Sequence, residues 1–326
     1  MKTDAATGAL VPFDFSGIYD EFPSLKRLNV DIEITTLERV IDSSNVTPEN
    51  WTTIAGIIAR EYERYDGFVV LHGTDTMSYT ASALSFMLRN LAKPVVFTGS
   101  QIPMGVLRTD GRENLVTAIE IAGARRSDGR PEIAEVALYF QNRLFRANRT
   151  TKRSAEELNA FRSYNYPPLA EVGVNIAYDR NAALAPATGA LEVFTGLSDR
   201  VMILKLNPGI REPLLRRMLS LEGVDGIVLE TYGAGNAPTA GWFTAAVAEA
   251  VEAGKILLNV TQCPDGRVSM GLYETGLALQ RAGVLCGYDI TSEAAVTKMM
   301  YVLGRESSRE ARVALLERPL CGEFTP

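Results

Sequence analysis

The stretch from residue 68 to residue 79 ends an apolar run with side chains that could do chemistry. It reads Phe-Val-Val-Leu-His-Gly-Thr-Asp-Thr-Met-Ser-Tyr, so a strand that stops at His72 would present Thr74, Asp75 and Thr76 before a helix begins. In open α/β sheets, ligands bind outside the carboxyl ends of the strands. Two hydroxyls and a carboxylate at such a place predict one half of an active site.

A basic segment further along the chain contains a lysine that could complete this chemistry. Lys152 follows two threonines there. A threonine hydroxyl is a poor nucleophile at neutral pH, but a partly neutral lysine can accept its proton, and a carboxylate can hold that lysine in place. Thr74, Asp75 and Lys152 supply these three groups if the segment folds back over the strand ends. The same residues are equally consistent with a helix cap, a carboxylate at the positive end of a helix and a surface lysine.

The charge of this segment favours an ordinary surface. Residues 142–153 carry, besides the lysine, four arginines, which are Arg143, Arg146, Arg149 and Arg153. Taken alone, such a cluster is more typical of a solvated charged surface than of a grip on phosphate or carboxylate groups. We therefore expect residues 142–153 to form a basic loop.

Several familiar kinds of site are excluded by the residues present. His72 is the only histidine, which excludes zinc sites of the His-Glu-x-x-His kind and cages built from several histidines. No Gly-x-Ser-x-Gly motif is present for a serine nucleophile. The Gly-Ala-Gly-Asn-Ala-Pro loop at 233–238 lacks the third glycine of a dinucleotide-binding loop.

Composition indicates a soluble enzyme of the cytoplasm. The net charge of -6 leaves no positive excess for nucleic acid or anionic membranes. The three cysteines, Cys263, Cys286 and Cys321, are too few and too widely spaced for a disulfide framework, so we expect free thiols in a reducing compartment. No apolar run is long enough to span a bilayer, and the first residues are too polar for a signal peptide.

The elements that must position these residues alternate along the chain. Strand-like and helix-like stretches follow one another with turn residues between them, which predicts an α/β fold with parallel strands covered by helices. Strands are expected at residues 30–36, 68–72, 95–98, 135–141 and 172–177. Helices are expected from Pro48, from residue 77 as far as Lys93-Pro94, and from Asp110 to Ala124, the last with Asp110 and Glu113 spaced like a variant capping box.

The length of 326 residues favours two domains, because one hydrophobic core rarely organises so long a chain. Alanine, proline and glycine cluster at 182–189. We therefore expect a larger N-terminal parallel-sheet domain at 1–181, a linker at 182–199 and a smaller C-terminal α/β domain at 200–326. In the second domain, strands are expected at 201–206, 226–231 and 255–260, and helices at 211–221, 240–253, 273–282 and 292–303.

Five motifs together give the chain a resemblance to the bacterial-type L-asparaginases. They are His-Gly-Thr-Asp-Thr-Met at 72–77, Thr-Gly-Ser-Gln at 98–101, Asp-Gly-x-x-Asn at 110–114, Asn-Arg-Thr-Thr-Lys at 148–152 and Tyr-Gly-x-Gly-Asn-x-Pro at 232–238. Asp-Ser-Ser at 42–44 and Thr-Gln-Cys at 261–263 make the cytoplasmic type I enzymes the most similar subgroup. The resemblance implies the two-domain asparaginase-like fold and hydrolysis of L-asparagine to L-aspartate and ammonia through an acyl-threonine. It implies no metal or cofactor, and homodimers or homotetramers.

The resemblance also implies a role for each matching residue at the site. Ser43 would bind the α-carboxylate of the substrate, with Asp42 and Ser44 in the same contact loop. Asp75 would receive the α-ammonium group. A fixed pair of opposite charges of this kind would select an α-amino acid and leave its side-chain amide to reach the reacting hydroxyls.

Two further roles are implied by the same resemblance. Thr74, Asp75 and Lys152 match the family's threonine-aspartate-lysine relay. Tyr273 resembles a tyrosine that reaches the site from a partner subunit, although an ordinary aromatic residue at a helix start is an equally good reading of it.

One family motif is missing from the sequence. Members begin with a short strand ending in Thr-Gly-Gly-Thr-Ile-Gly, whose second threonine is acylated, and residues 1–4 align best with the residues directly after that motif. We therefore expect the chain as given to be inactive, and less stable because the place of the missing strand would expose sheet and apolar surface. Three explanations are open: a start assigned too far downstream, a shortened form or a true pseudoenzyme. The first two are favoured. A non-catalytic amino-acid-binding pseudoenzyme and an amidase subunit of a tRNA-amidotransferase stay open as alternatives.

A second departure concerns regulation. Some type I enzymes have an allosteric asparagine site in the smaller domain, where an arginine lies two residues before the Tyr-Gly-x-Gly-Asn loop. Thr261 and Cys263 match that site, but Glu230 stands in the arginine's position. Because its charge would repel a substrate carboxylate, we expect this site to be lost or altered.

Overall fold

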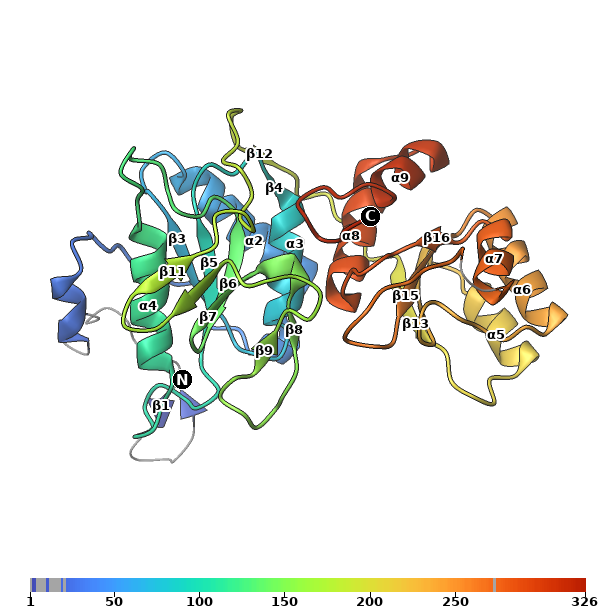
Figure 1. Cartoon of the computed structure of the whole chain (residues 1–326), viewed down its shortest axis with the longest axis horizontal. Helices are drawn as coiled ribbons and strands as arrows, with labels where there is room; N and C mark the ends of the chain where they lie inside the picture. Colours follow the sequence, from blue (N-terminus) through green and yellow to red (C-terminus); the bar gives the residue numbers. More distant parts are fainter. Residues whose placement is uncertain (1, 4–9, 12–18, 20–21, 272–273) are drawn as a thin grey trace. The chain divides into compact units, whose positions relative to one another are not determined.

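The structure is a computed structural model that describes residues 2–3, 10–11, 19, 22–271 and 274–326 (Figure 1). The chain forms two compact units. Unit 1 comprises the described residues up to Leu84 together with Leu88–Ser163 and Pro167–Val193, and unit 2 comprises Ser85–Met87, Tyr164–Tyr166 and Phe194–Pro326. The proposed boundaries at 181 and 199 stay a prediction.

Unit 1 is built on a six-stranded sheet, as far as the described residues show, in the order β11-β10-β7-β6-β5-β3. Its strands are β3 (Phe68–Leu71), β5 (Val95–Thr98), β6 (Val136–Phe140), β7 (Arg143–Arg146), β10 (Ala170–Val172) and β11 (Ile176–Tyr178). The pairs β3–β5 and β5–β6 are parallel, and the pairs beyond β6 are antiparallel. Every residue of β5 and β6 is buried, as the near-continuous apolar runs of a covered parallel strand predict. This arrangement confirms the expected α/β class.

Three helices of unit 1 begin close to where the sequence predicts them. They are α2 (Pro48–Glu61), α3 (Met77–Met87) and α4 (Gly111–Gly123). α2 begins with proline in its first turn and a capping box in which Thr47 and Asn50 exchange hydrogen bonds. The predicted end of α3 at Lys93-Pro94 is wrong, because Leu88–Arg89 (β4) leaves the helix to pair with Glu192–Val193 (β12).

Two strand predictions in unit 1 need correction. Residues 30–36 form no strand, although Val30 and Ile32 pack against the core cluster around Leu25 and Leu115. Their alternating pattern therefore reflects apolar contacts without a hydrogen-bonded neighbouring strand. Residues 172–177 are not one strand either, since β10 and β11 form a hairpin that turns between them.

The prediction of a solvated basic loop at 142–153 is wrong. The segment holds β7, the 3₁₀ turn η3 (Ala147–Arg149) and β8 (Thr151–Lys152), which pairs with β9 (Phe161–Arg162). Arg146 and Arg149 are 4% and 3% exposed. Arg146 Nε lies 2.6 Å from the buried Glu135 carboxylate, and this opposite charge allows the guanidinium to be buried.

Unit 2 contains a four-stranded parallel sheet in the order β13-β14-β15-β16, within the residues that are described. Its strands are β13 (Val201–Lys205), β14 (Gly226–Thr231), β15 (Ile256–Thr261) and β16 (Leu285–Cys286). The helices are α5 (Glu212–Leu219), α6 (Gly241–Glu252), α7 (Glu274–Arg281), α8 (Ser292–Arg305) and α9 (Arg309–Leu316). The predictions for this domain are confirmed to within a few residues, and β16 and α9 were not predicted.

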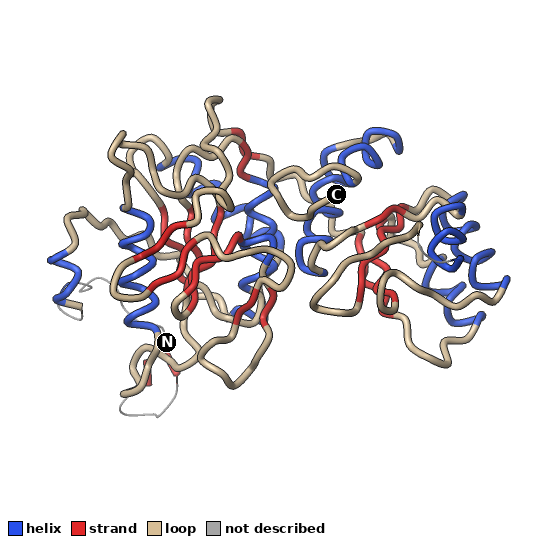
Figure 2. The backbone as a smooth tube through the Cα atoms, viewed as in Figure 1, coloured by secondary structure: helices blue, strands red, loops and turns tan. Residues whose placement is uncertain are grey.

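Alternate residues of β14, an inner strand of the unit 2 sheet, belong to two separate apolar clusters. Ile227 and Leu229 belong to the cluster that includes residues of α5, α6 and α7, whereas Val228 belongs to the cluster that includes residues of α8 and α9. Helices therefore cover both faces of this sheet, as Figure 2 shows.

Two further short strands of the chain, Lys2–Thr3 (β1) and Leu10–Val11 (β2), pair with each other. No described helix is both long and apolar enough to cross a membrane.

Candidate active site

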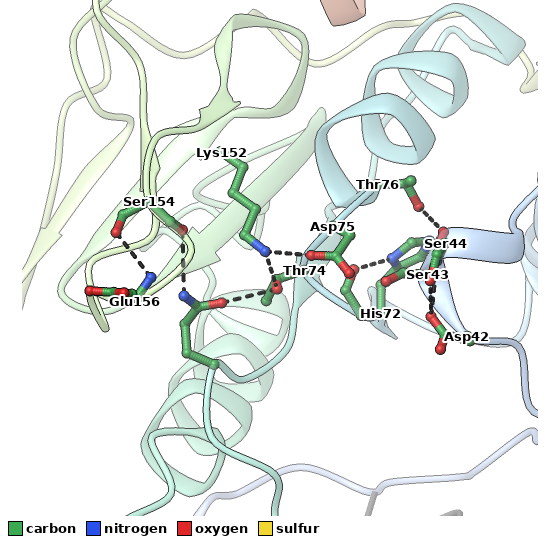
Figure 3. A network of polar contacts seen from close by, with 12 residues as sticks. Asp42, Ser43, Ser44, His72, Thr74, Asp75, Thr76, Lys152, Ser154 and Glu156 are labelled. Atoms are coloured by element: carbon green, nitrogen blue, oxygen red, sulfur yellow. Dashed lines mark hydrogen bonds and ion pairs between the residues drawn. The ribbon is translucent and has the colours of Figure 1, made fainter.

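The turn after β3 brings Thr74 and Asp75 against Lys152, which lies 78 and 77 residues further along the chain. Lys152 Nζ donates to Thr74 Oγ1 at 2.8 Å and to Asp75 Oδ1 at 2.6 Å (Figure 3). β8 returns toward the carboxyl end of β3 and so brings Lys152 to this place. A relay by Thr74, Asp75 and Lys152 requires this return of the chain. The side chain of Lys152 is 19% exposed, whereas that of Asp75 is 62% exposed. Asp75 therefore has free surface on which to meet a cation from solvent.

A fourth side chain, Gln101, determines the direction of the hydrogen bond at Thr74. Gln101 Nε2 donates to the backbone oxygens of Ser154 and Glu157 at 3.5 and 3.2 Å, so its oxygen must face the other way. That oxygen accepts the Thr74 hydroxyl proton at 3.0 Å. The Thr74 hydroxyl therefore directs its own proton to Gln101 and accepts a hydrogen bond from Lys152 Nζ.

Asp110 and Asn114 hold the backbone turn that carries Gln101. The Asp110 carboxylate accepts from the backbone N–H groups of Gln101 and Ile102 at 3.0–3.1 Å, and from Asn114 Nδ2 at 3.1 Å. Asn114 also donates to the Gly99 carbonyl at 2.9 Å. The predicted capping box of Asp110 with Glu113 is wrong, because the carboxylate faces the 99–102 turn and makes no cap bond to α4.

The Asp42–Ser44 loop lies against the same strand end. Asp42 accepts from the backbone N–H of Ser44 at 3.0 Å and from its hydroxyl at 2.6 Å, and these bonds lower the pKa of Asp42 below its usual range. Thr76 Oγ1 donates to the Ser43 carbonyl at 2.6 Å, and Ser43 is buried. A Cβ added at Gly73 would lie 2.5 Å from Ser43 Oγ, so only glycine allows this close approach.

Tyr273 lies outside the described residues.

In unit 2, the three residues of the expected allosteric site have partners of their own. Ser292 Oγ donates to Glu230 Oε1 at 2.5 Å, and Lys205 Nζ lies 3.5 Å from Glu230 Oε2. Thr261 Oγ1 donates to the Gly233 carbonyl and accepts from the backbone N–H of Cys263, whose side chain is exposed. The loss of an allosteric site here stays a prediction.

The residues that sequence reasoning missed are Gln101, Asp110 and Asn114. Their motifs, Thr-Gly-Ser-Gln and Asp-Gly-x-x-Asn, were recognised without a reason for their side chains. The structure supplies that reason, since Asp110 and Asn114 fix a turn and Gln101 projects from it to Thr74. Small polar residues at the end of a second buried strand, β5, were the available signal.

Together, these groups could bind an α-amino acid and transfer a proton. The exposed carboxylate of Asp75 suits an ammonium group, and the hydroxyls and N–H groups of the Asp42–Ser44 loop suit a carboxylate. A hydroxyl in contact with a lysine is the arrangement used to move protons in nucleophilic catalysis.

Comparisons with known proteins agree over most of the chain. Residues 1–184 match the family described as asparaginase, N-terminal, and residues 200–316 match the glutaminase/asparaginase C-terminal domain. L-asparaginase 1 of Escherichia coli (strain K12) is 44% identical over 296 residues, which cover 91% of this chain and 86% of that protein. The crystal structure of L-asparaginase I from Vibrio cholerae O1 matches with a TM-score of 0.90 and 40% identity, covering 99% of this chain and 95% of that one.

A more distant relative has a different printed name. A glutamyl-tRNA(Gln) amidotransferase subunit of Pyrococcus abyssi is 31% identical over 343 residues, which cover 100% of this chain and 76% of that protein. Higher identity and nearly complete mutual coverage favour the asparaginases over this relative. With both family descriptions matched and the Thr-Asp-Lys contact present in unit 1, the chain belongs to the bacterial-type L-asparaginase family.

Proposed function

We propose that the protein is an L-asparaginase, which hydrolyses L-asparagine to L-aspartate and ammonia. The observation that carries this proposal is the contact of Lys152 Nζ with both Thr74 Oγ1 and Asp75 Oδ1 in a chain of this family. The 44% identity to L-asparaginase 1 of Escherichia coli supports the same substrate. We propose in addition a cytoplasmic homodimer or homotetramer, with Tyr273 contributed to the site of a partner subunit.

In the proposed mechanism, Asp75 receives the α-ammonium of asparagine and Ser43 receives its α-carboxylate, with Asp42 and Ser44 shaping the loop. A threonine hydroxyl attacks the side-chain amide carbon, its proton passes to the leaving nitrogen, and the carbon–nitrogen bond breaks, which releases ammonia and leaves an acyl-threonine ester. Water then cleaves that ester and releases L-aspartate. Thr74, Asp75 and Lys152 relay the protons, and the Thr74 hydroxyl must turn from Gln101 toward Lys152 Nζ before Lys152 can accept its proton.

The acylated threonine of the proposed mechanism is that of the Thr-Gly-Gly-Thr-Ile-Gly motif, which the 326 residues do not contain. We therefore propose that these 326 residues alone release little or no ammonia. Thr3 and Thr7 are poor substitutes, because the sequence places neither after a strand and a glycine turn that would fix its hydroxyl.

Ammonia release from L-asparagine tests the proposal. The 326-residue chain and a form extended by a strand ending in Thr-Gly-Gly-Thr-Ile-Gly are compared, and Lys152→Met in the extended form serves as the relay variant. We expect turnover only in the extended form and a loss of at least about 100-fold in the Lys152→Met variant. Equal turnover with and without the extension would contradict the missing-nucleophile proposal, and full activity of Lys152→Met would contradict the relay.

Two alternative functions are compared with this proposal. Binding of L-aspartate in calorimetry without ammonia release, even from the extended form, would select a non-catalytic amino-acid-binding pseudoenzyme. A role in a tRNA-amidotransferase is favoured by the 31% identity to the Pyrococcus abyssi protein, but the net charge of -6 gives little support to an RNA surface.

Sigmoidal asparagine kinetics abolished by changing Thr261 would show that the site around Glu230 has kept its regulation.

A further inference from the structure

A chain of hydrogen bonds runs from the packed side of α2 to the turn that carries Thr74. Trp51 Nε1, in α2, lies 3.0 Å from Thr80 Oγ1, in α3. Thr80 Oγ1 lies 2.9 Å from His72 Nε2, and His72 Nδ1 lies 2.7 Å from the Gly73 carbonyl oxygen. Trp51 is 7% exposed and Thr80 is fully buried, so solvent does not supply alternative partners for these two side chains.

The chemistry of the end groups fixes the direction of every bond in this chain. An indole N–H only donates and a carbonyl oxygen only accepts. His72 Nδ1 must therefore carry a proton to bond Gly73. In the neutral ring Nε2 then has none, so it accepts the hydroxyl proton of Thr80, which in turn accepts from Trp51. Burial lowers the pKa of His72, which keeps the ring neutral near pH 7.

This orientation bears directly on Thr74. The peptide group between Gly73 and Thr74 is planar, so a donor that holds the Gly73 carbonyl also sets the direction of the Thr74 N–H. Ser43 Oγ would lie 2.5 Å from a Cβ at Gly73, so the same peptide borders the Asp42–Ser44 loop. Thr74 and Asp75, which come next in the chain, hold Lys152.

We propose that His72, fixed as its Nδ1–H tautomer by Thr80 and Trp51, is a positioning residue that orients the Gly73–Thr74 peptide for binding of the α-amino acid. Its effect on substrate rests on the proposed function, whereas its tautomer and its bond to Gly73 do not. His72 does not act as an acid or base here, because both ring nitrogens are already bonded to groups of the protein.

The single histidine of the chain makes the tautomer directly measurable. A ¹⁵N spectrum of the histidine ring contains signals from His72 alone, apart from any purification tag, which is removed. We expect the Nδ1–H tautomer, together with a ¹³C signal of the Gly73 carbonyl typical of a strong hydrogen bond. An Nε2–H tautomer would overturn the proposal outright.

Variants of Thr80 test the positioning role. Thr80→Val removes the donor to Nε2, Thr80→Ser retains it, and Thr53→Val is the matched control on an exposed face of α2. We expect Thr80→Val to shift the Gly73 carbonyl signal and to weaken L-aspartate binding about tenfold, with Thr80→Ser and Thr53→Val close to the unaltered chain. Trp51→Phe, which removes only the first donor, replaces Thr80→Val if that variant does not fold.

The outcomes separate this inference from the proposed function. An unchanged Gly73 carbonyl signal in Thr80→Val, or equal L-aspartate affinity in Thr80→Val and Thr80→Ser, would contradict positioning by His72. If the unaltered chain binds no L-aspartate, the ring and carbonyl signals alone decide the role of His72, and the proposed function is decided separately by ammonia release from the extended form.

Discussion

Individual side chains at the site are fixed by partners that are far away in the sequence. Thr74 contacts Gln101 and Lys152, and the amide of Gln101 is oriented by bonds to the backbone oxygens of Ser154 and Glu157. The exposed Lys152–Asp75 pair adds little to stability, since pairs open to water contribute at most about 1 kcal/mol. These contacts therefore matter for the geometry of the site more than for the stability of the fold.

At the same scale, His72 gives the protein a pH-dependent stability. Burial holds its folded pKa below the ordinary value of 6.5, while the bond to the Gly73 carbonyl opposes part of that shift. Below pH 6.5 the unfolded chain binds more protons than the folded one, so stability is lost as the pH falls from 6.5 through the folded pKa. We expect the free energy of unfolding to fall more steeply between about pH 7.5 and pH 5.5 than in a His72→Gln variant. Parallel curves for the two proteins would contradict this.

Among the elements, the turn after β5 depends on a carboxylate held by α4. Asp110 is 6% exposed, and its carboxylate accepts from the N–H groups of Gln101, Ile102 and Asn114. In Asp110→Asn, the amide would place one of its own N–H groups against these donors. The substitution therefore removes bonds to a charged group and adds a clash of donors.

We expect Asp110→Asn to lower the free energy of unfolding by about 2–3 kcal/mol in urea titrations. Asp128→Asn is the matched control, because the Asp128 side chain is 45% exposed and its ion pair with Arg130 is open to water, so its loss should change the free energy of unfolding little. Similar small losses in both variants would show that the 99–102 turn does not depend on Asp110. Since this turn carries Gln101, Asp110→Asn should also weaken L-aspartate binding.

For the whole molecule, each unit has its own sheet, and the proposed site draws its described residues from unit 1 alone. Unit 2 fastens the end of the chain through a buried ion pair. Lys298 in α8 and Glu323 are both fully buried, with Nζ and Oε1 2.8 Å apart. Lys298 also donates to the Leu316 and Arg318 carbonyls, and Glu323 accepts from the N–H groups of Leu320 and Cys321. Every charge in this cluster therefore has several partners.

Removal of Lys298 should destabilise the protein strongly, because it leaves Glu323 buried and unpaired. We expect Lys298→Met to lower the free energy of unfolding by about 3–5 kcal/mol, and the double variant Lys298→Met, Glu323→Leu to lose less. Lys205→Met, at a lysine whose side chain is 64% exposed, controls for the change of residue type. A loss below about 1 kcal/mol in the single variant, measured by urea titration, would contradict this account.

The sequence by itself determined most of the elements and the residue types of the site. Apolar periodicity is a local property, so β3, β5, β6, β14 and β15 and their helices could be predicted from it. The motif at 72–77 also placed Thr74 and Asp75 at a strand end without any knowledge of the fold. Lys152 could only be named as a conditional partner, because its contact spans 78 residues.

Only the tertiary structure decided which local patterns are used. Residues 30–36 alternate like a strand but pair with none, α3 ends at Met87 because β4 pairs with β12, and Arg146 is buried because Glu135 lies beside it. The direction of the Thr74 hydroxyl likewise depends on Gln101, whose amide is oriented by backbone oxygens 53 and 56 residues further along the chain than Gln101. Hydrogen-bond partners and countercharges come from distant parts of the chain, and local sequence does not encode where they meet.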